Sequence, residues 1–349
     1  MVISPLAPTP TRRPTPAGPA SPLARRTVGV AAGGGRLLAA AMLAAIVAPV
    51  AAQTWPARPV RVIVPFPPGS APDTIMRVVT QPMAQAAGQP FVMDNRPGAN
   101  GNIGVEVAAR ATPDGYTLVS ANNTTFAGNA SLYRKLPFDI ERDFAPVARF
   151  ITTGLVLVVR NDLPAKDVRE FVALARARPG KLTAAQASAG MRVSIGMMRS
   201  LASAELLEVA YKGTPQAVAD LMGGQIDSTF TDFAAGLSLI RAGKMRALGV
   251  TTARRSAALP DVPSIGEAIP GYDLTVWAGL AAPAAVPRPV IDRLWELASR
   301  SLALPEVRKA LGEMSFATEP LDPTQFRDYI RSETRRWAKL VKDAGIEPE

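Results

Sequence analysis

Short runs of β-branched and aliphatic residues alternate along this chain with longer segments in which apolar residues recur at helical spacing. Residues 60–64 form one such run, which predicts a short buried strand. Pro65 has no N–H to donate to a sheet and is expected to end that strand. After a proline-rich turn, apolar residues follow helical spacing and predict a helix over residues 73–87.

The same alternation continues through the rest of the chain and predicts an α/β protein. Further strands are expected at residues 91–93, 116–120, 181–185, 206–210, 226–230, 246–250 and 273–280. Further helices are expected at residues 105–111, 168–177, 194–203, 216–222, 233–242, 287–302, 305–313 and 322–344. Strands that alternate with helices are typical of parallel, doubly wound sheets covered on both faces.

The two halves of the chain are alike in build, which predicts two lobes with a cleft between them. We expect residues 53–152 and 273–349 to form lobe 1 and residues 153–272 to form lobe 2. In α/β proteins of this kind, ligands bind beyond the carboxyl ends of the strands, so the cleft is the expected binding site.

Residues 1–52 have the layout of a secretory signal peptide. Arg25 and Arg26 precede an apolar run at 37–50, and small residues lead to a cleavage site before Gln53. The run has ~14 residues, fewer than the ~20 that span a bilayer. The protein is therefore expected in the periplasm. Arg25-Arg26 also admits a twin-arginine signal, although the residues after the pair match that signal poorly.

The charge and composition exclude several classes of function. The formal net charge is +10, but the expected signal peptide carries five of the 39 basic residues, which leaves about +5 for the mature chain. Nucleic acid is therefore not an expected partner. The chain has no cysteine and no histidine, which removes disulfides, thiolate metal sites, cysteine catalysis and a Ser-His-Asp triad. These absences argue against an enzyme, and no metal or cofactor site is expected.

The loop between the first strand and the first long helix is a candidate binding site. Three prolines stiffen it, and Gly69 can adopt positive φ. A helix that begins at such a loop directs free backbone N–H groups and the positive end of its dipole toward one point, which suits a carboxylate. A plain strand-to-helix turn is the alternative.

The glycine-rich stretch at residues 98–104 does not indicate a nucleotide site. Its spacing is G-x-x-G-x-x-G, whereas a dinucleotide site has G-x-G-x-x-G followed by an acidic residue about 20 positions on, after a second strand. Turn geometry and helix packing account better for these glycines.

Four further residues are candidates on the expected cleft. Ser194 is predicted to begin a helix, where it acts either as the N-cap or as part of a second anion-binding site. Arg192 is either solvated or holds a second carboxylate in bidentate fashion. Asn123 lies in a polar run after the third strand, and Asp232 begins a helix, where a cap is the alternative role.

Several blocks of this chain together resemble the Bug family of extracytoplasmic solute receptors of tripartite tricarboxylate transporters. These blocks, in register over nearly the whole mature chain, are residues 63–69 with Asp73, 95–104, 113–118, 132–139, 143–147, 211–213, 221–227 and 259–263. The resemblance implies a periplasmic-binding-protein fold of type II, in which two lobes close on a small carboxylate.

The resemblance also implies which residues hold the ligand. Backbone groups and water bind it at the first loop, and hydroxyls bind it at a helix start in lobe 2. Carried over to this chain, these residues are Phe66, Pro67, Pro68, Gly69, Ser70, Asp73 and Ser194. The expected protein is a monomer that captures a mono- or dicarboxylate and delivers it to the membrane components of a transporter.

Three positions depart from the family's pattern. Ser70 replaces a common second glycine, Met197 replaces a common histidine, and Arg192 lies in a loop that is usually small and uncharged. One alternative function is a receptor that signals to a partner. The other is a secreted hydrolase or lyase that uses Ser194 or Asp73, for which the chain offers no histidine base.

Overall fold

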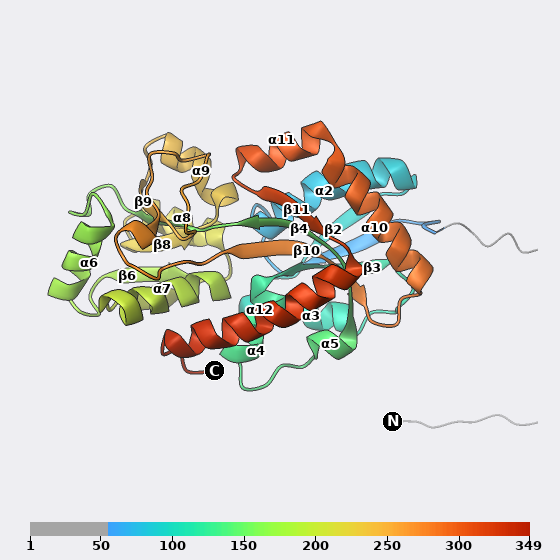
Figure 1. Cartoon of the computed structure of the whole chain (residues 1–349), viewed down its shortest axis with the longest axis horizontal. Coiled ribbons are helices and arrows are strands. Elements are labelled where there is room, and N and C mark those ends of the chain that lie inside the picture. The colour runs from blue at the N-terminus through green and yellow to red at the C-terminus, as the bar shows by residue number, and fades with distance from the viewer. Residues whose placement is uncertain (1–54) are drawn as a thin grey trace, which may run out of the picture. The chain divides into compact units, whose positions relative to one another are not determined.

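The computed structural model describes residues 55–349, in which two β-sheets form the centres of two lobes (Figure 1). The expected signal peptide, residues 1–52, lies outside the described residues. Both lobes belong to one compact unit, Gln53–Glu349.

Lobe 1 is built on a six-stranded sheet with the order β11-β4-β10-β3-β1-β2. Its strands are β1 (Val60–Val64), β2 (Phe91–Asn95), β3 (Thr117–Asn122), β4 (Phe144–Thr153), β10 (Val276–Pro283) and β11 (Ala317–Leu321). Its helices are α2 (Ala71–Ala87), η1 (Ala99–Gly101), α3 (Asn102–Ala109), the π-helix η2 (Thr124–Gly128), α4 (Asn129–Leu132), α5 (Ile140–Asp143), α10 (Arg288–Ala303), α11 (Pro305–Glu313) and α12 (Pro323–Asp343).

Lobe 2 is built on a five-stranded sheet with the order β7-β6-β8-β5-β9. Its strands are β5 (Val156–Val159), β6 (Thr183–Gln186), β7 (Leu207–Ala210), β8 (Ser228–Thr231) and β9 (Arg246–Val250). Its helices are α6 (Val168–Ala177), α7 (Ala189–Ala202), α8 (Thr214–Met222) and α9 (Phe233–Arg241), and the short helix η3 (Ile265–Glu267) lies in the segment that returns to lobe 1.

Both sheets are mixed, so the expectation of purely parallel sheets was wrong. Strands β1, β2 and β3 are parallel, but β10 runs antiparallel to β3 and β4, and β11 runs antiparallel to β4. In lobe 2, β5 runs antiparallel to both β8 and β9. The reason is the connection between the lobes: β4 leads out of lobe 1 and β10 leads back into it, so these two neighbours run in opposite directions.

The buried strands and amphipathic helices follow the hydrophobic pattern of the sequence. The aliphatic residues of β1 are fully buried, and α2 packs its apolar face into the same core. The spans predicted at 60–64, 168–177, 246–250 and 305–313 are confirmed to the residue. Strand β11 and the short helices α4 and α5 were not predicted, because each is too short or too polar to show a period.

Two segments connect the lobes, and Thr251 holds them together. Leu155 lies in the outgoing crossover, between β4 and β5. Its N–H donates to Thr251 Oγ1 at 2.9 Å, and its carbonyl accepts from the Thr251 N–H at 2.9 Å. The Thr251 hydroxyl donates to the Leu274 carbonyl at 2.8 Å, and the Leu274 N–H donates to the Thr251 carbonyl at 2.8 Å. One fully buried threonine therefore joins the outgoing and returning crossovers at the hinge.

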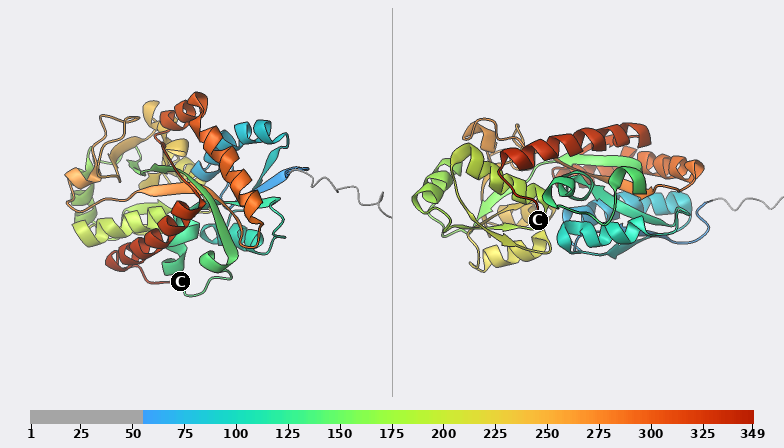
Figure 2. Two further views of the ribbon diagram at one scale, coloured as in Figure 1. Left: turned by 45° about the vertical axis from the view of Figure 1, so that its right-hand side comes forward. Right: turned by 90° about the horizontal axis from the view of Figure 1, so that it is seen from below.

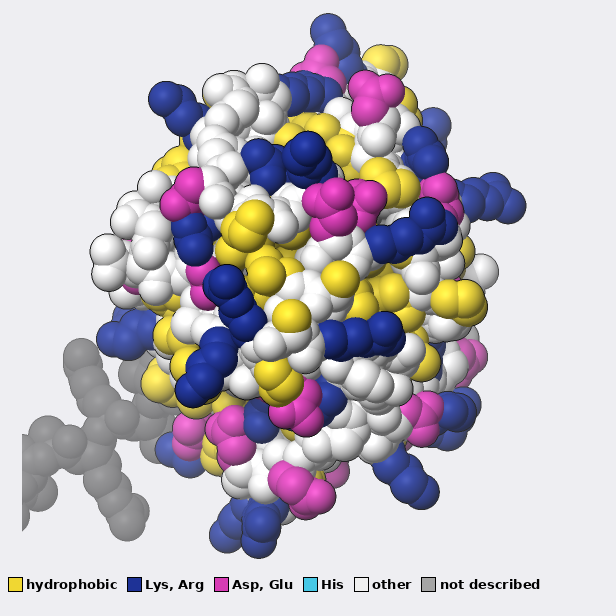
Figure 3. Space-filling model, turned by 90° about the vertical axis from the view of Figure 1, so that its left-hand side faces the viewer, with side chains coloured by type: hydrophobic (Ala, Val, Ile, Leu, Met, Phe, Trp, Pro, Cys, Tyr) yellow, Lys and Arg dark blue, Asp and Glu magenta, His cyan; other side chains and the backbone are white. Residues whose placement is uncertain are grey.

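The two lobes lie side by side, and α12 extends along lobe 1 toward lobe 2 (Figure 2). Within residues 55–349, none of the helices combines the length and the apolar character needed to span a bilayer. On the end of the molecule seen in Figure 3, basic and acidic side chains are interspersed. That face is therefore not a single basic surface of the kind that binds nucleic acid.

Candidate ligand-binding site

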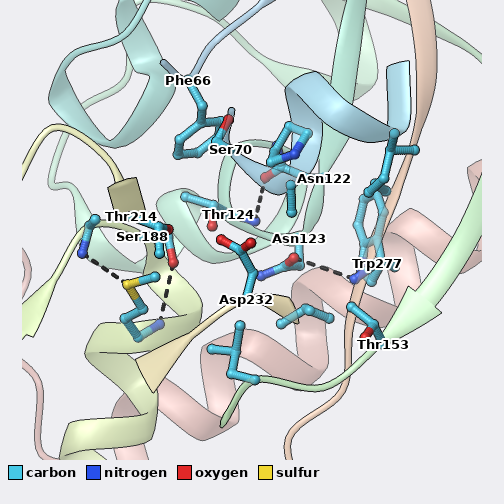
Figure 4. A pocket seen from close by; sticks show the side chains of 18 of the residues that line it. Phe66, Ser70, Asn122, Asn123, Thr124, Thr153, Ser188, Thr214, Asp232 and Trp277 are labelled. Atoms are coloured by element: carbon cyan, nitrogen blue, oxygen red, sulfur yellow. Dashed lines mark hydrogen bonds between the residues drawn. The ribbon is translucent and has the colours of Figure 1, made fainter. Parts of the chain in front are cut away.

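A pocket of about 580 Å³, counted to its open mouth, lies between the two lobes (Figure 4). Lobe 1 lines it with Phe66, Ser70, Ala71, Pro72, Ile75, Asn122, Asn123, Thr124, Ile151, Thr153, Val276, Trp277 and Ala278. Lobe 2 and the outgoing crossover line it with Leu155, Ala187, Ser188, Met191, Thr214 and Asp232. Its mixture of apolar walls with a few polar groups is that of a small-molecule site.

Four α-helices begin at the wall of this pocket. Ser70 is the N-cap of α2, Ser188 is the N-cap of α7, Thr214 is the first residue of α8, and Asp232 is the N-cap of α9. The first turn of each helix has backbone N–H groups without partners in the helix, and the helix dipole adds a partial positive charge there. The pocket is therefore surrounded by groups that attract an anion.

The polar run after β3 adds side-chain donors. Asn122 Oδ1 accepts the N–H groups of Thr124 and Thr125, at 2.9 and 3.2 Å, which fixes the orientation of the amide. Its Nδ2 is buried and has no hydrogen-bond partner among the described residues. Asn123 also lines the pocket, and its Oδ1 accepts the backbone N–H of Trp277 at 3.4 Å. An unpaired buried amide is costly, so Asn122 Nδ2 is suited to donate to a ligand.

Only some residues of the loop between β1 and α2 line the pocket. Phe66 and Ser70 line the pocket, whereas Pro68 and Gly69 are exposed and Pro67 packs against lobe 2. Gly69 has φ +78°, a conformation that its lack of a side chain allows.

Asp73 shapes this loop and does not line the pocket. Its carboxylate accepts from the Gly69 N–H, from Asn95 Nδ2 and from the Arg77 guanidinium, with the shortest distance to each 3.0 Å. Burial raises the pKa of Asp73, but the hydrogen bonds from Arg77, Gly69 and Asn95 outweigh it and hold the pKa below its usual range. Asp73 is thus ionised, and its hydrogen bonds hold the loop in position from outside the pocket.

The sequence matches the family described as "Tripartite tricarboxylate transporter family receptor" over residues 75–346. The chain belongs to this family. It is a family of transporter receptors and not of enzymes, which argues against the hydrolase or lyase alternative. The family resemblance and the two-lobed α/β fold predicted from the sequence are confirmed.

This chain matches three relatives over nearly the whole length of each relative. Protein BugT of Bordetella pertussis is 33% identical over 306 residues, which are 86% of this chain and 94% of BugT. The structure of Rpa4515 of R. palustris with adipate is 31% identical, with a TM-score of 0.82, over 84% of this chain and 100% of that one. The structure of MatC from Rhodopseudomonas palustris with bound malate is 30% identical, with a TM-score of 0.78, over 82% and 100% of the two chains.

The predicted helix start at Ser194 was wrong, and the receptor's pocket does not include that residue. Helix α7 begins five residues earlier, where Ser188 Oγ accepts the Met191 N–H at 3.4 Å. Ser194 therefore lies in the middle of α7, fully buried, and its carbonyl accepts from the Tyr272 hydroxyl at 2.9 Å. The small residues before Ser194 suggested a loop, but they continue the helix.

Arg192 also lies in α7 and away from the pocket of the receptor. Its guanidinium contacts the Glu349 carboxylate at 2.6 Å and lies 3.9 Å from the carboxylate of Glu208. The structure thus directs Arg192 toward the C-terminal segment of lobe 1, and the expectation that it faces the cleft was wrong.

Several lining residues of the receptor were not predicted. Ser188 could have been found as the polar residue that follows strand β6, but Trp277 gives no signal in the sequence. Trp277 Nε1 donates to Glu333 Oε2 at 3.1 Å, and Trp337 Nε1 donates to the same oxygen at 3.1 Å. Helix α12 therefore holds the indole that forms one wall of the pocket.

Asp232 is the one ionisable residue among those that line the pocket. Its Oδ1 accepts the Ala235 N–H at 2.9 Å as the cap of α9. Burial raises the pKa of this carboxyl, more than the hydrogen bonds from Ala235 and Thr214 lower it. Among residues 55–349, no group of three or more acidic side chains is placed to hold a metal ion.

Proposed function

We propose that this receptor captures a small mono- or dicarboxylate between its lobes and delivers it to the membrane components of a tripartite transporter. The observation that carries the proposal is the meeting of four helix N-termini at one pocket whose lining includes no lysine or arginine. Such a site binds an anion through backbone N–H groups and hydroxyls and through helix dipoles. The adipate and malate bound by two relatives support this class of ligand.

The apolar walls suit the carbon skeleton of such a ligand. Phe66, Ile75 and Trp277 from lobe 1 line the pocket together with Leu155 and Met191. Closure of the lobes would exclude water, and the lower local dielectric would strengthen each hydrogen bond to the carboxylate. Function in the periplasm is part of the proposal, and it is supported by the expected signal peptide and by the periplasmic relatives.

Titration calorimetry and thermal melting with aliphatic and aromatic carboxylates test the proposal. At a hundredfold excess over Kd, a ligand adds ~2.7 kcal/mol to the free energy of unfolding. Small-angle scattering should also report a smaller radius of gyration with the ligand. A panel that changes neither the melting temperature nor the radius would contradict a carboxylate receptor.

The variant Asn122→Asp tests whether the ligand binds in this pocket. The variant keeps the oxygen that accepts from Thr124 and Thr125, but it replaces the free donor with a negative charge. We expect the affinity for carboxylates to fall at least ~10-fold, which is ~1.4 kcal/mol. Asn161→Asp, on the exposed face of lobe 2, is the matched control and should bind normally. Equal affinity in both variants would place the ligand elsewhere.

A further inference from the structure

Asp232 directs its carboxyl group into the pocket that is proposed above to bind an anion (Figure 4). The residue is only 7% exposed. Its Oδ1 caps α9, and the neutral Thr214 hydroxyl also donates to the carboxyl group. An acidic side chain at this place is unexpected, because a bound carboxylate would bring a second negative charge into the same enclosed space.

The protein supplies no cation to this carboxyl group within the described residues. The half-buried or buried Asp73, Asp94 and Asp227 are paired with Arg77, Arg61 and Arg160 respectively. Asp232 has no such pair, and none of the residues that line the pocket is basic. Its surroundings are polar but neutral: Asn123, Thr124 and Thr214 with the N-terminus of α9.

Charges in a closed pocket must be compensated, since the solvent that would screen them is excluded. Burial raises the pKa of Asp232, which means that the ionised carboxylate is disfavoured while the pocket holds no cation. A ligand that carries an ammonium group next to its carboxylate removes this cost. The ligand carboxylate then faces the helix N-termini while its ammonium group faces Asp232.

We propose that Asp232 binds an ammonium group of the ligand, so that the preferred ligand is an amino-substituted mono- or dicarboxylate. This inference rests on the proposed function, because it assumes that the carboxylate site is this pocket. A hydroxyl substituent would also donate to Asp232, but it leaves the charge of the carboxylate uncompensated. A hydrogen bond between charged groups is the stronger of the two in a dry site.

Matched ligands that differ in one substituent test the inference by titration calorimetry at pH 7. Succinate, malate and aspartate share a four-carbon skeleton with hydrogen, hydroxyl or ammonium, and adipate with 2-aminoadipate forms a longer pair. In the wild-type protein, at least one of the two amino-substituted ligands should bind ten times or more as tightly as its unsubstituted parent.

Asp232→Asn removes the charge but keeps a side chain that caps α9 equally well. In this variant the preference for the amino-substituted ligand should fall at least tenfold, and the parent should bind as well as before or better. Asp167→Asn makes the same change at the N-cap of α6, outside the pocket, and should leave the preference intact. Melting curves of both variants report whether the caps still hold the helices.

The outcomes separate the two proposals. The role of Asp232 would be overturned if both parents bind the wild type as tightly as their amino derivatives, or if the preference is unchanged in Asp232→Asn. In both cases the carboxylate site itself would stand. If none of the five ligands binds the wild-type protein, the role of Asp232 is overturned, and the wider panel of aliphatic and aromatic carboxylates decides the proposed function separately.

Discussion

The ring of Pro67 in lobe 1 packs directly against the α-carbon of Gly213 in lobe 2. A Cβ atom built on Gly213 would lie 2.5 Å from Pro67 Cγ and 2.6 Å from Pro67 Cδ, far inside the contact distance of two carbons. The two residues belong to the loop before α2 and the turn before α8, the same segments that present helix N-termini to the pocket. Their contact therefore forms where the lobes meet.

Gly213→Ala should hold the lobes apart. Gly213 has an extended backbone, with φ −176°, so alanine adds no backbone strain and acts only through its methyl group. We expect the affinity for a carboxylate ligand to fall at least ~10-fold, or ~1.4 kcal/mol, and the melting temperature without ligand to change little. Calorimetry and small-angle scattering of the ligand-bound protein measure the two effects.

Pro67→Ala in the same chain is the matching control. Removal of the ring makes room for the new methyl group, so the double variant should recover much of the lost affinity. If the double variant binds no better than Gly213→Ala alone, the clash between these two residues is not the cause.

Asp73→Asn should make the protein less sensitive to acid. The hydrogen bonds from Arg77, Gly69 and Asn95 lower the pKa of Asp73 in the folded state, so ionised Asp73 stabilises the fold above its unfolded pKa of about 3.9. This stabilisation is lost as the pH falls through the lower folded pKa. The variant should be less stable than the wild type at pH 7, and the difference should shrink as the pH falls below about 4. Urea unfolding at pH 7, 5 and 3 tests this, and a constant difference would contradict it.

Thr251→Val should weaken the hinge. The substitution keeps the shape of the side chain but removes both the acceptor for Leu155 N–H and the donor to the Leu274 carbonyl, which are buried. We expect a loss of about 1–3 kcal/mol in the free energy of unfolding, because these groups lose their partners. Thr251→Ser keeps the hydroxyl and should lose clearly less. Urea denaturation compares the two, and equal losses would indicate packing as the cause.

Arg192→Ala should affect stability and not ligand selection. Its guanidinium pairs with Glu349 and faces Glu208, outside the pocket. We expect a loss of about 1–3 kcal/mol in the free energy of unfolding, because the Arg192 side chain is largely buried and its removal leaves Glu349 and Glu208 without a cationic partner. The affinities for a monocarboxylate and a matched dicarboxylate should both stay within twofold of the wild type. A selective loss for the dicarboxylate would restore Arg192 as a ligand residue.

The candidate site could be predicted only in part, and the reason is the difference between local and non-local signals. The β1–α2 loop was found because proline, glycine and a following helical period are adjacent in the sequence. Asp73 was chosen with that loop, yet its carboxylate points to Arg77 and Asn95 behind it. Proximity in sequence brought Asp73 near the pocket, but its hydrogen-bond partners decide where the side chain points.

Trp277 and Asn122 show what adjacency in sequence cannot reveal. Each reaches the pocket because β10 pairs with β3 in lobe 1, and that pairing joins segments more than 150 residues apart. The error in the predicted start of α7 has another cause. Small residues from Ala187 onward are compatible with a loop or a helix, and the Ser188 cap together with the close packing of Ala189 against Gly128 of lobe 1 fixes the helix start there.

The sequence by itself determined the class of this protein. Hydrophobic periods defined most strands and helices because buried faces must be apolar, and the absence of histidine and cysteine removed the common catalytic groups. Tertiary structure alone decided the direction of the strands, the convergence of four helix N-termini on one pocket and the burial of Asp232 without a basic partner. These properties depend on contacts between lobes and between distant strands, and such contacts leave no local period in the chain.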